Sequence, residues 1–489
     1  MKDPLCGQTR REMLWHTGGG FAGTALTYLL GQTGFFGRTA QAAEAAPVSP
    51  LAPKKPHFAA KAKSCIFLFM YGAPSHIDTW DPKPELVKRH GQPMPNMDTD
   101  PLLKMRSSRL GALLGSKRVF TKTGQSGIEV SDFYPHVGRH VDDLAVIRGM
   151  YTDSFAHGSG LLQMNTGFVR QGHPSLGSWL TYGLGTENQN LPAYVVMLDQ
   201  HGGPISGPPN WSSGFMPATY QGTQFRSVGD PILNMDPPEG VTAQQQRRQL
   251  ELLAELNRSR GPAGPENHEL MARIASFELA FRMQSTAPEA VDLTKESAGT
   301  KTLYGFDNPL TEKYGRSCLI ARRLIERNVR FVQLYSGGGH GDNTWDAHRD
   351  VDENHTVRCG ETDQPIAALL TDLKRRGLLD ETLVIWGGEF GRMPVTDTTR
   401  VGTKGRGRDH NPRGFSMWMA GGGIKGGQIV GRTDDFGYSA IDDKIHVHDL
   451  HATILHLMGF DHTQLTYFNG GRSMRLTDVH GHVVKQLIA

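Results

Sequence analysis

The sequence has few cysteines, little excess charge and, beyond its N-terminal region, no long apolar run. Only four cysteines occur among 489 residues, and because no two of them form a CxxC pair, a thiolate zinc site is not indicated. The formal net charge of +3 indicates no nucleic-acid-binding surface. No segment after residue 36 reaches the length of apolar sequence that a spanning helix needs, so we expect no membrane span there. Walker and dinucleotide-binding glycine motifs are also missing, although the chain contains 59 glycines.

The N-terminal region has the order of segments typical of a secretory signal. Arg10 and Arg11 form a twin arginine, and a glycine-rich, weakly apolar stretch follows over residues 18–36. Ala40-Gln41-Ala42 then gives a small-x-small cleavage pattern. The paired arginines favour the twin-arginine export route. The alternative is an anchored N-terminal helix, for which the stretch is short and interrupted.

These observations predict three parts of the chain. Residues 1–42 are a twin-arginine signal peptide, residues 43–62 an Ala/Pro/Lys-rich linker, and residues 63–489 a single domain. The mature protein is then expected in the periplasm or outside the cell, with no membrane span after signal removal. Cys6 leaves with the signal, and a disulfide between Cys318 and Cys359 stays open at this point.

Apolar runs that end in glycine-rich loops alternate with amphipathic segments. The runs predict buried strands over residues 64–71, 143–148, 193–198, 330–335, 382–386 and 415–420. The amphipathic segments predict helices over residues 243–286, 363–376 and 449–458. This alternation is typical of an α/β fold with a doubly wound, mostly parallel sheet and helices on both faces. Ligands bind such sheets at the carboxyl ends of the strands.

Imidazole and carboxylate side chains gather in three loops that follow predicted strands. These loops cover residues 75–81, 340–348 and 388–410, and their candidate metal ligands are Asp78, Asp342, Asp346, His348, Glu389 and His410. Mixed nitrogen and oxygen ligands suit zinc, manganese or calcium. One or two such ions could polarise a phosphoryl or sulfuryl oxygen. For Asp78, a role in stabilising the turn explains the residue equally well.

A fourth stretch, residues 152–160, leads from a predicted strand into a helix. A helix N-terminus stabilises an anion or a nucleophile, so His157 and Ser154 are candidates for the attack on the substrate. Thr152 or Ser159 could be the nucleophile in place of Ser154, and His157 could be a ligand, a base or the nucleophile itself. The alternative is ordinary N-capping of that helix by Asp153 or Ser154. Arg392 or Arg408 is the candidate for binding the substrate anion. Four histidines on or before the last predicted helix are interpreted as mostly structural or surface residues: His446, His448, His451 and His456.

At this point the residues resemble a known family. The run from Leu379 into Gly388-Glu389-Phe390-Gly391-Arg392 is similar to the metal loop of sulfatases, and residues 449–459 are similar to their closing helix. Over residues 64–486 the chain resembles the planctomycete-type exported sulfatase-like family known as domain of unknown function 1501. The hallmarks are Gly72 to Lys83, Trp345 to His348, Glu389 to Arg392 and Gly407 to His410. The resemblance implies an alkaline phosphatase/sulfatase-like fold.

The departures from the sulfatase pattern shape the functional expectation. His157 stands where sulfatases have the cysteine that becomes formylglycine, and no Cys-x-Pro-x-Arg motif occurs. Glu389 and Phe390 replace the Asp-His pair of the metal loop. We therefore expect a metal-dependent hydrolase of small-molecule or glycan sulfate or phosphate esters that does not use formylglycine. The alternative is a catalytically degenerate relative that binds a sulfated or phosphorylated glycan or a partner protein; phosphoryl transfer within one substrate is a third interpretation.

Overall fold

The structure, a computed structural model, describes residues 49–226, 231–232, 240–258, 265–400 and 405–489. The predicted signal peptide and the first part of the predicted linker lie outside the described residues. Residues Pro50–Ala489 form one compact unit. The described end of the linker lies along this unit, since the Lys54 amide donates to Leu184 O (2.8 Å) and the Ala62 amide to Leu457 O (2.9 Å). In the described ranges, no helix has both the length and the apolar character needed to cross a membrane.

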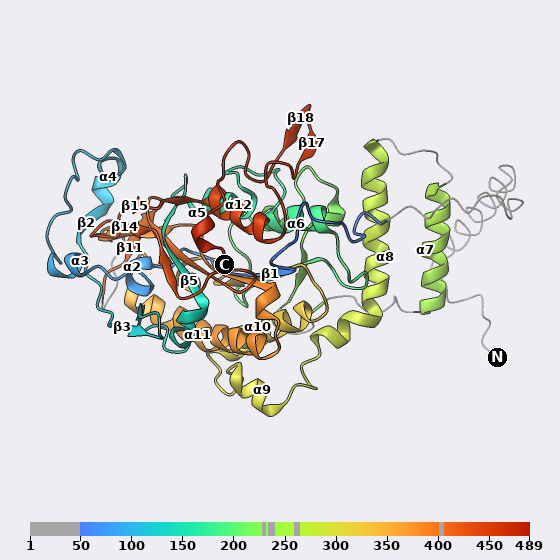
Figure 1. Ribbon diagram of the computed structural model, residues 1–489, viewed down its shortest axis with the longest axis horizontal. Helices are drawn as coiled ribbons and strands as arrows, with labels where there is room; N and C mark the ends of the chain where they lie inside the picture. Colours follow the sequence, from blue (N-terminus) through green and yellow to red (C-terminus); the bar gives the residue numbers. More distant parts are fainter. Residues whose placement is uncertain (1–48, 227–230, 233–239, 259–264, 401–404) are drawn as a thin grey trace, which may run out of the picture. The chain divides into compact units, whose positions relative to one another are not determined.

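A nine-stranded sheet forms the centre of this unit (Figure 1). The strand order is β13-β5-β12-β9-β1-β8-β6-β7, with β16 paired to β5. The strands are β1 (Ser64–Met70), β5 (Leu144–Tyr151), β6 (Tyr194–Met197), β7 (Thr223–Phe225), β8 (Phe331–Ser336), β9 (Thr382–Gly387), β12 (Phe415–Ala420), β13 (Gln428–Val430) and β16 (Ile445–His446). Only β12 runs antiparallel to its neighbours, β5 and β9. The prediction of a mostly parallel sheet is therefore confirmed, and all six predicted strands are present.

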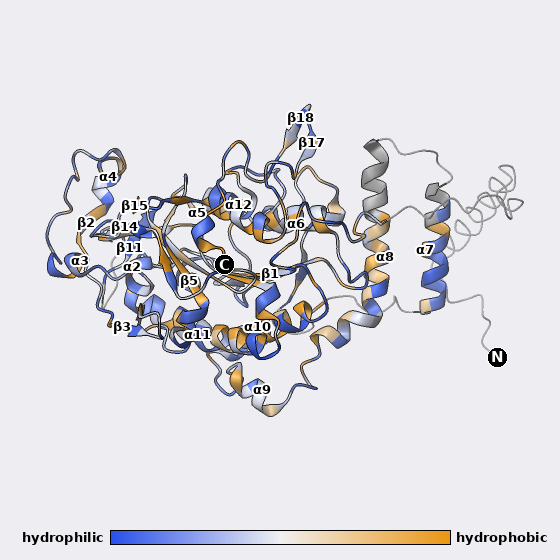
Figure 2. Ribbon diagram, viewed as in Figure 1, coloured by the Kyte–Doolittle hydropathy of each residue, from blue (hydrophilic) through white to orange (hydrophobic). Residues whose placement is uncertain are grey.

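Helices cover both faces of the sheet, as predicted. Alternate side chains of β1 point to opposite faces, so Ile66 and Leu68 join one buried cluster while Cys65 and Phe67 join the other. The first cluster includes α10 (Glu312–Ile325) and α11 (Val351–Arg375). The second includes α5 (His157–Thr166), α6 (Leu176–Leu184) and α12 (Val447–Leu457). In Figure 2 the central strands are accordingly orange, which marks hydrophobic residues.

The predicted helices are present, with different bounds. The segment 243–286 contains α7 (Ala243–Arg258) and most of α8 (Pro265–Val291), which ends five residues beyond it, and the last predicted helix is α12. Helix α11 begins at Val351, twelve residues before its predicted start at residue 363. It begins there because the Asp350 carboxylate accepts hydrogen bonds from the amides of Asp352 and Glu353, each at 3.1 Å. The loop with Asp346 and His348 is therefore held directly against a helix start.

Smaller elements complete the unit. A three-stranded antiparallel sheet has the order β11-β10-β2, with β2 at Leu110–Leu113, β10 at Gly391–Asp397 and β11 at Arg408–Asn411. The short helices are α2 (His76–Thr79), α3 (Pro84–Lys88), α4 (Pro101–Arg106) and α9 (Ala298–Leu303). The remaining strands form hairpins β3 (Phe120–Thr123) with β4 (Ile128–Ser131), β14 (Arg432–Thr433) with β15 (Ala440–Asp442), and β17 (Tyr467–Asn469) with β18 (Arg472–Met474). Cys65, Cys318 and Cys359 are free and buried, so the disulfide left open above does not form.

Candidate metal centre

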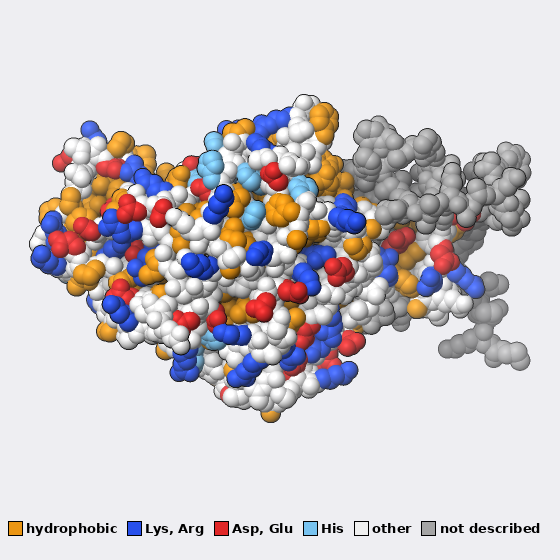
Figure 3. Space-filling view, in the orientation of Figure 1, with side chains coloured by type: hydrophobic (Ala, Val, Ile, Leu, Met, Phe, Trp, Pro, Cys, Tyr) orange, Lys and Arg blue, Asp and Glu red, His pale blue; other side chains and the backbone are white. Residues whose placement is uncertain are grey.

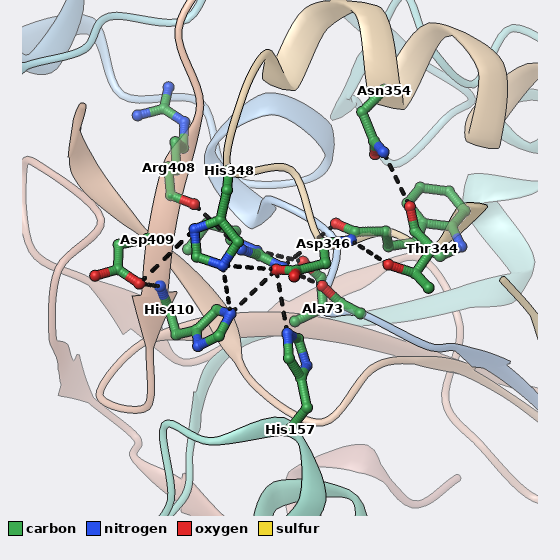
Figure 4. Close-up of polar contacts among 12 residues, drawn as sticks. Ala73, His157, Thr344, Asp346, His348, Asn354, Arg408, Asp409 and His410 are labelled. Carbon is green, nitrogen blue, oxygen red and sulfur yellow. Dashed lines mark hydrogen bonds and ion pairs between the residues drawn. The ribbon is translucent and has the colours of Figure 1, made fainter. Parts of the chain in front are cut away.

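Three histidine side chains converge on one carboxylate where β5, β8 and β9 end. The Nε2 atoms of His157, His348 and His410 lie 3.1, 3.0 and 3.1 Å from Oδ1 of Asp346. The Nε2 atoms of His348 and His410 are 3.0 Å apart. Figure 4 shows the three rings pointing toward Asp346 from different elements. His157 is the first residue of α5, Asp346 and His348 follow β8, and His410 lies on β11.

This arrangement fits a tetrahedral metal ion. Zinc binds imidazole nitrogen and carboxylate oxygen at about 2.0–2.1 Å, which places the ligand atoms of a tetrahedral site about 3.3 Å apart. The 3.0 to 3.1 Å separations between the four side chains are close to that value. All four ligand atoms lie within 4.8 Å of one another. His157, Asp346, His348 and His410 would therefore hold the ion.

Two of the rings are fixed from behind by buried carboxylates. His157 Nδ1 donates to Glu389 Oε1 at 2.6 Å, and His348 Nδ1 donates to Asp397 Oδ2 at 2.6 Å. Both carboxylates are fully buried. A carboxylate on one ring nitrogen places the proton there and leaves the other nitrogen with its lone pair free for a metal. The donor set is therefore arranged as in protein zinc sites.

The charges around the cluster favour a cation. Asp346, Glu389, Asp397 and Asp409 face two guanidinium groups: Arg392 pairs with Asp346, and Arg106 pairs with Asp409. Four carboxylates against two arginines leave two negative charges, which are costly when buried. Protons on the histidines or one divalent cation would balance them.

The pKa values of the cluster follow from the same contacts. Burial alone would lower the pKa of His157, but its hydrogen bonds to Asp346 and Glu389 raise it to about 9. Burial and the nearby His157 hold the pKa of His410 well below its usual value. Burial opposes ionisation of Asp346, but the Arg392 guanidinium and the three histidines hold its pKa well below its usual range. Asp346 is therefore ionised and His410 is neutral, the forms in which each could bind a metal.

Close backbone packing places Asp346. Gly72 has φ +109°, and a Cβ there would lie 2.6 Å from the backbone nitrogens of both Trp345 and Asp346. The Trp345 ring is fully buried and its Nε1 donates to Ser336 Oγ at 3.1 Å. The Trp345 amide donates to Tyr71 O at 2.9 Å. Because Trp345 is anchored inward, the next side chain, Asp346, is directed to the cluster.

Arg392 is the cation that supports Asp346. Its Nη2 lies 2.6 Å from Asp346 Oδ1, its Nε donates to Ala73 O at 2.9 Å, and its Nη1 donates to Arg408 O at 3.1 Å. Further bonds reach Gly72 O and Trp345 O, and the side chain is fully buried. With these donors in use, Arg392 positions the cluster and has little capacity to bind a substrate anion, the role predicted for it.

One side of the cluster is open to solvent. The side chains of His157, Asp346 and His410 are 15%, 16% and 14% exposed, so solvent reaches this side. Because four protein ligands fill a tetrahedral site, a water or a substrate would bind the ion there as a fifth ligand. Tyr71 and Phe390 line the neighbourhood of His157, with ring centroids 6.0 and 5.0 Å from the imidazole. The first amides of α5 adjoin this side, because His157 is the first residue of the helix. The first hydrogen bond of the helix runs from Gly160 N to Ala156 O at 2.8 Å, so the amides before Gly160 have no partner within the helix.

Several predicted site residues come together here. Asp346, His348 and His410, predicted as metal ligands, and His157, predicted as catalytic, form the four-residue cluster. Glu389, predicted as a ligand, lies behind His157, and it also accepts from the Gly72 amide at 3.1 Å. Its contacts make it the residue that orients His157.

Other predicted residues lie outside the cluster. Asp78 is buried and paired with Arg408, whose Nε lies 2.8 Å from Asp78 Oδ2. Asp342 has a 72% exposed side chain and lies 3.6 Å from Arg349. Ser154 shares a 2.5 Å hydrogen bond with Ser159 Oγ, and its other bonds go to Ala156. The N-cap of α5 is Ala156, so Asp153 and Ser154 do not cap the helix.

Sequence reasoning missed three residues of the surroundings. Asp397 ends β10 and holds His348, while Asp409 precedes His410 and lies 4.0 Å from His348 Nδ1. Arg106, at the end of α4, pairs with Asp409 and donates to His410 O at 2.8 Å. Asp397 stands at the end of β10, a short strand whose residues show no clear alternation in the sequence.

Replacing Glu389 with glutamine is expected to weaken metal affinity about tenfold, because the partner of a metal-bound histidine typically contributes 10- to 100-fold. The amide keeps the shape but removes the charge that polarises His157. Competition with a chelating dye measures the change. Glu381→Gln is the matched control, since Glu381 is 53% exposed and paired with Lys63. Equal affinities of Glu389→Gln and the unchanged protein would contradict this role.

The comparisons with known proteins place the chain in a family. A family model described as "Protein of unknown function (DUF1501)" matches residues 62–488, so the chain belongs to this family, as its sequence predicted. No curated protein matches the chain significantly.

Solved structures resemble the chain only distantly. The lipoteichoic acid synthase LtaP from Listeria monocytogenes is 9% identical with a TM-score of 0.35, covering 87% of this chain and 78% of its own. The PsFucS1 sulfatase from Pseudoalteromonas sp. is 13% identical with a TM-score of 0.35, covering 83% and 68%. Alkaline phosphatase from the Antarctic bacterium TAB5 is 12% identical with a TM-score of 0.32, covering 82% and 99%. At this level of similarity, no residue role or activity of this chain can be inferred from these structures.

Proposed function

We propose that the protein is a zinc-dependent hydrolase of sulfate or phosphate esters that does not use formylglycine. The observation that carries the proposal is the convergence of three imidazoles and one carboxylate, open to solvent on one side. Three nitrogen ligands favour zinc over calcium, which prefers oxygen. When bound, zinc acts as a Lewis acid and lowers the pKa of water.

The residues of the chain supply the rest of the site. The free amides at the start of α5 adjoin His157 and would bind the non-bridging oxygens of the ester, since a helix N-terminus favours anions. Glu389 and Asp397 hold two of the rings in place. Ser154 and Ser159 stand at the same helix start, and their mutual 2.5 Å bond keeps a hydroxyl pair near the bound anion.

A hydrolysis assay tests the proposal. The full chain, purified with zinc, manganese or calcium, is incubated with aryl sulfate and aryl phosphate esters. We expect metal-dependent release of the aryl alcohol, which Asp346→Asn abolishes and Asp342→Asn leaves unchanged. A protein that holds its metal but cleaves neither ester class would overturn the proposal.

One observation favours a binding function as the second candidate. Arg392 and Arg408 are both fully buried with their donors used by carboxylates and carbonyl oxygens, so neither is free to stabilise a transition state. A protein of this kind would bind a sulfated or phosphorylated glycan without turnover. Calorimetry with a sulfated oligosaccharide, showing binding and no product, would support this candidate.

Export is proposed on the sequence alone. Replacing both Arg10 and Arg11 with lysine is expected to retain the protein in the cytoplasm of a host that carries the twin-arginine route, because that route requires the paired arginines. Cell fractionation followed by immunoblotting measures this. Periplasmic protein in equal amount from both forms would contradict the proposed route.

A further inference from the structure

The histidines that precede and begin α12 face α5, the helix that carries His157. β16 pairs in parallel with the end of β5, so the start of α12 lies near the segment that follows β5 and leads to α5. Figure 3 shows histidine side chains gathered on the face over α12. His446, His448 and His451 contact the α5 region, whereas His456 packs against Phe58 instead, with ring centroids 4.9 Å apart.

Two of these histidines bond the C-terminal end of α5. His451 Nε2 donates to Met164 O at 2.8 Å, and His448 Nε2 donates to Gly167 O at 2.7 Å. The last carbonyl groups of a helix lack partners within the helix and need donors from elsewhere. Met164 is fully buried, so water cannot readily replace the His451 donor. The two rings therefore fix where α5 ends.

The third histidine contacts the segment before α5. His446 Nε2 lies 3.2 Å from Asp153 Oδ2. Gln163 of α5 bonds the same segment, accepting from Thr152 Oγ1 at 2.7 Å and from the Asp153 amide at 3.1 Å. His446 itself is held by its place as N-cap of α12, where its amide donates to Asp449 Oδ2 at 2.8 Å. The connection that leads to His157 is thus tied to α5 and to α12.

The burial of these rings sets their proton positions. Burial, assisted by the neighbouring His448, lowers the pKa of His451 to about 3. The ring is therefore neutral, and because its Nε2 faces a carbonyl oxygen, the single proton is on Nε2. Nδ1 of His448 and of His451 has no hydrogen-bond partner within the described ranges. The only metal-ligating groups found among the described residues lie elsewhere, so these rings act as donors.

We propose that His446, His448 and His451 are positioning residues that hold the C-terminal end of α5 and the segment before the helix, and thereby place His157 in the metal cluster. The proposal rests on the metal site proposed above, in which His157 is a ligand. Neither Asp346 nor the other two histidines of the cluster lies on α5. A shift of α5 along its axis would therefore move His157 relative to ligands that stay in place, and metal affinity would fall.

Substitutions at His451 test the proposal through metal affinity. His451→Leu keeps the volume and removes the donor, whereas His451→Gln keeps an N–H donor at similar reach. Zinc affinity is measured by chelator competition on the full chain, together with the visible spectrum of the cobalt-substituted protein. We expect about tenfold weaker zinc binding and an altered cobalt spectrum for His451→Leu. His451→Gln is expected to restore both, and His456→Leu, on the same helix, to change neither.

The outcomes separate this proposal from the metal site itself. No metal binding by the unchanged protein would overturn the proposed site. Metal binding that is equal in the unchanged protein and His451→Leu would overturn the positioning role alone. Equal weakening by leucine and glutamine would also overturn it, because the donor would then not be the cause. If His451→Leu does not fold, Asp153→Ala is used instead, because the Asp153 side chain is 63% exposed and its loss should not unfold the protein. We expect about threefold weaker zinc binding for Asp153→Ala. Unchanged zinc affinity would count against the proposal.

Discussion

Replacing Asp346 with asparagine is expected to lower zinc affinity by about two orders of magnitude. Asp346 is the one negatively charged group in the cluster, and its Oδ1 is shared by three histidines and Arg392. Four-ligand zinc sites in small peptides gain about 10–16 kcal/mol at pH 7, so one ligand contributes about 3 kcal/mol, or about a hundredfold. Isothermal titration of the metal-free protein with zinc measures the change.

Asp342→Asn is the matched control for this substitution. Both aspartates lie in the loop between β8 and α11, but the side chain of Asp342 is 72% exposed and bonded to none of the cluster residues. We expect unchanged zinc affinity for Asp342→Asn. A fall in affinity for this variant equal to that of Asp346→Asn would show that the loop, and not the Asp346 ligand, governs binding.

Replacing Asp78 with asparagine is expected to destabilise the fold by about 3–5 kcal/mol at pH 7, because it leaves a buried guanidinium without its anion. Arg408 Nε and Nη2 lie 2.8 and 3.3 Å from the two Asp78 oxygens, and both side chains are fully buried. Ser75 Oγ also donates to Asp78 at 2.5 Å. Urea unfolding of the metal-free protein measures the loss.

The effect of Asp78 should depend on pH. Burial alone would raise the pKa of Asp78, but the Arg408 guanidinium lowers it from its usual 3.8 to about 2. Because the folded value is the lower one, the pair stabilises the protein above about pH 4, and this stabilisation is lost as the pH falls through 2. The difference between the unchanged protein and Asp78→Asn should therefore shrink below pH 4. A difference in unfolding free energy between the two proteins that stays constant from pH 7 to pH 2.5 would contradict the pairing. Asp442→Asn is the control, because Asp442 forms an exposed pair with Arg432, and it should leave the unfolding free energy unchanged.

The central sheet could be predicted because its signal is local. Strands such as β1 and β9 are buried on both faces, so each is a continuous apolar run, and the glycines that follow mark the ends. The antiparallel direction of β12 has no such signal, because direction depends on the path of the chain between strands. The small sheet β11-β10-β2 joins residues nearly 300 positions apart, and its short strands alternate too briefly to be found by pattern.

The candidate site could be predicted only in part, for a physical reason. His348 and Asp346 were recognised because imidazole and carboxylate are frequent in one loop, but Asp342 in the same loop points to solvent. The anchoring of the buried Trp345 decides which aspartate faces the cluster, and that depends on packing with Tyr71 and Ser336. Asp78 was a candidate ligand because its loop follows a predicted strand, and only the fold shows that its partner is the Arg408 guanidinium.

The metal content of the purified protein tests the central claim most directly. Elemental mass spectrometry of the untagged protein is predicted to find about one equivalent of zinc, lost in Asp346→Asn and kept in Asp342→Asn. No zinc, with none taken up on dialysis against zinc, manganese or calcium, would contradict the account.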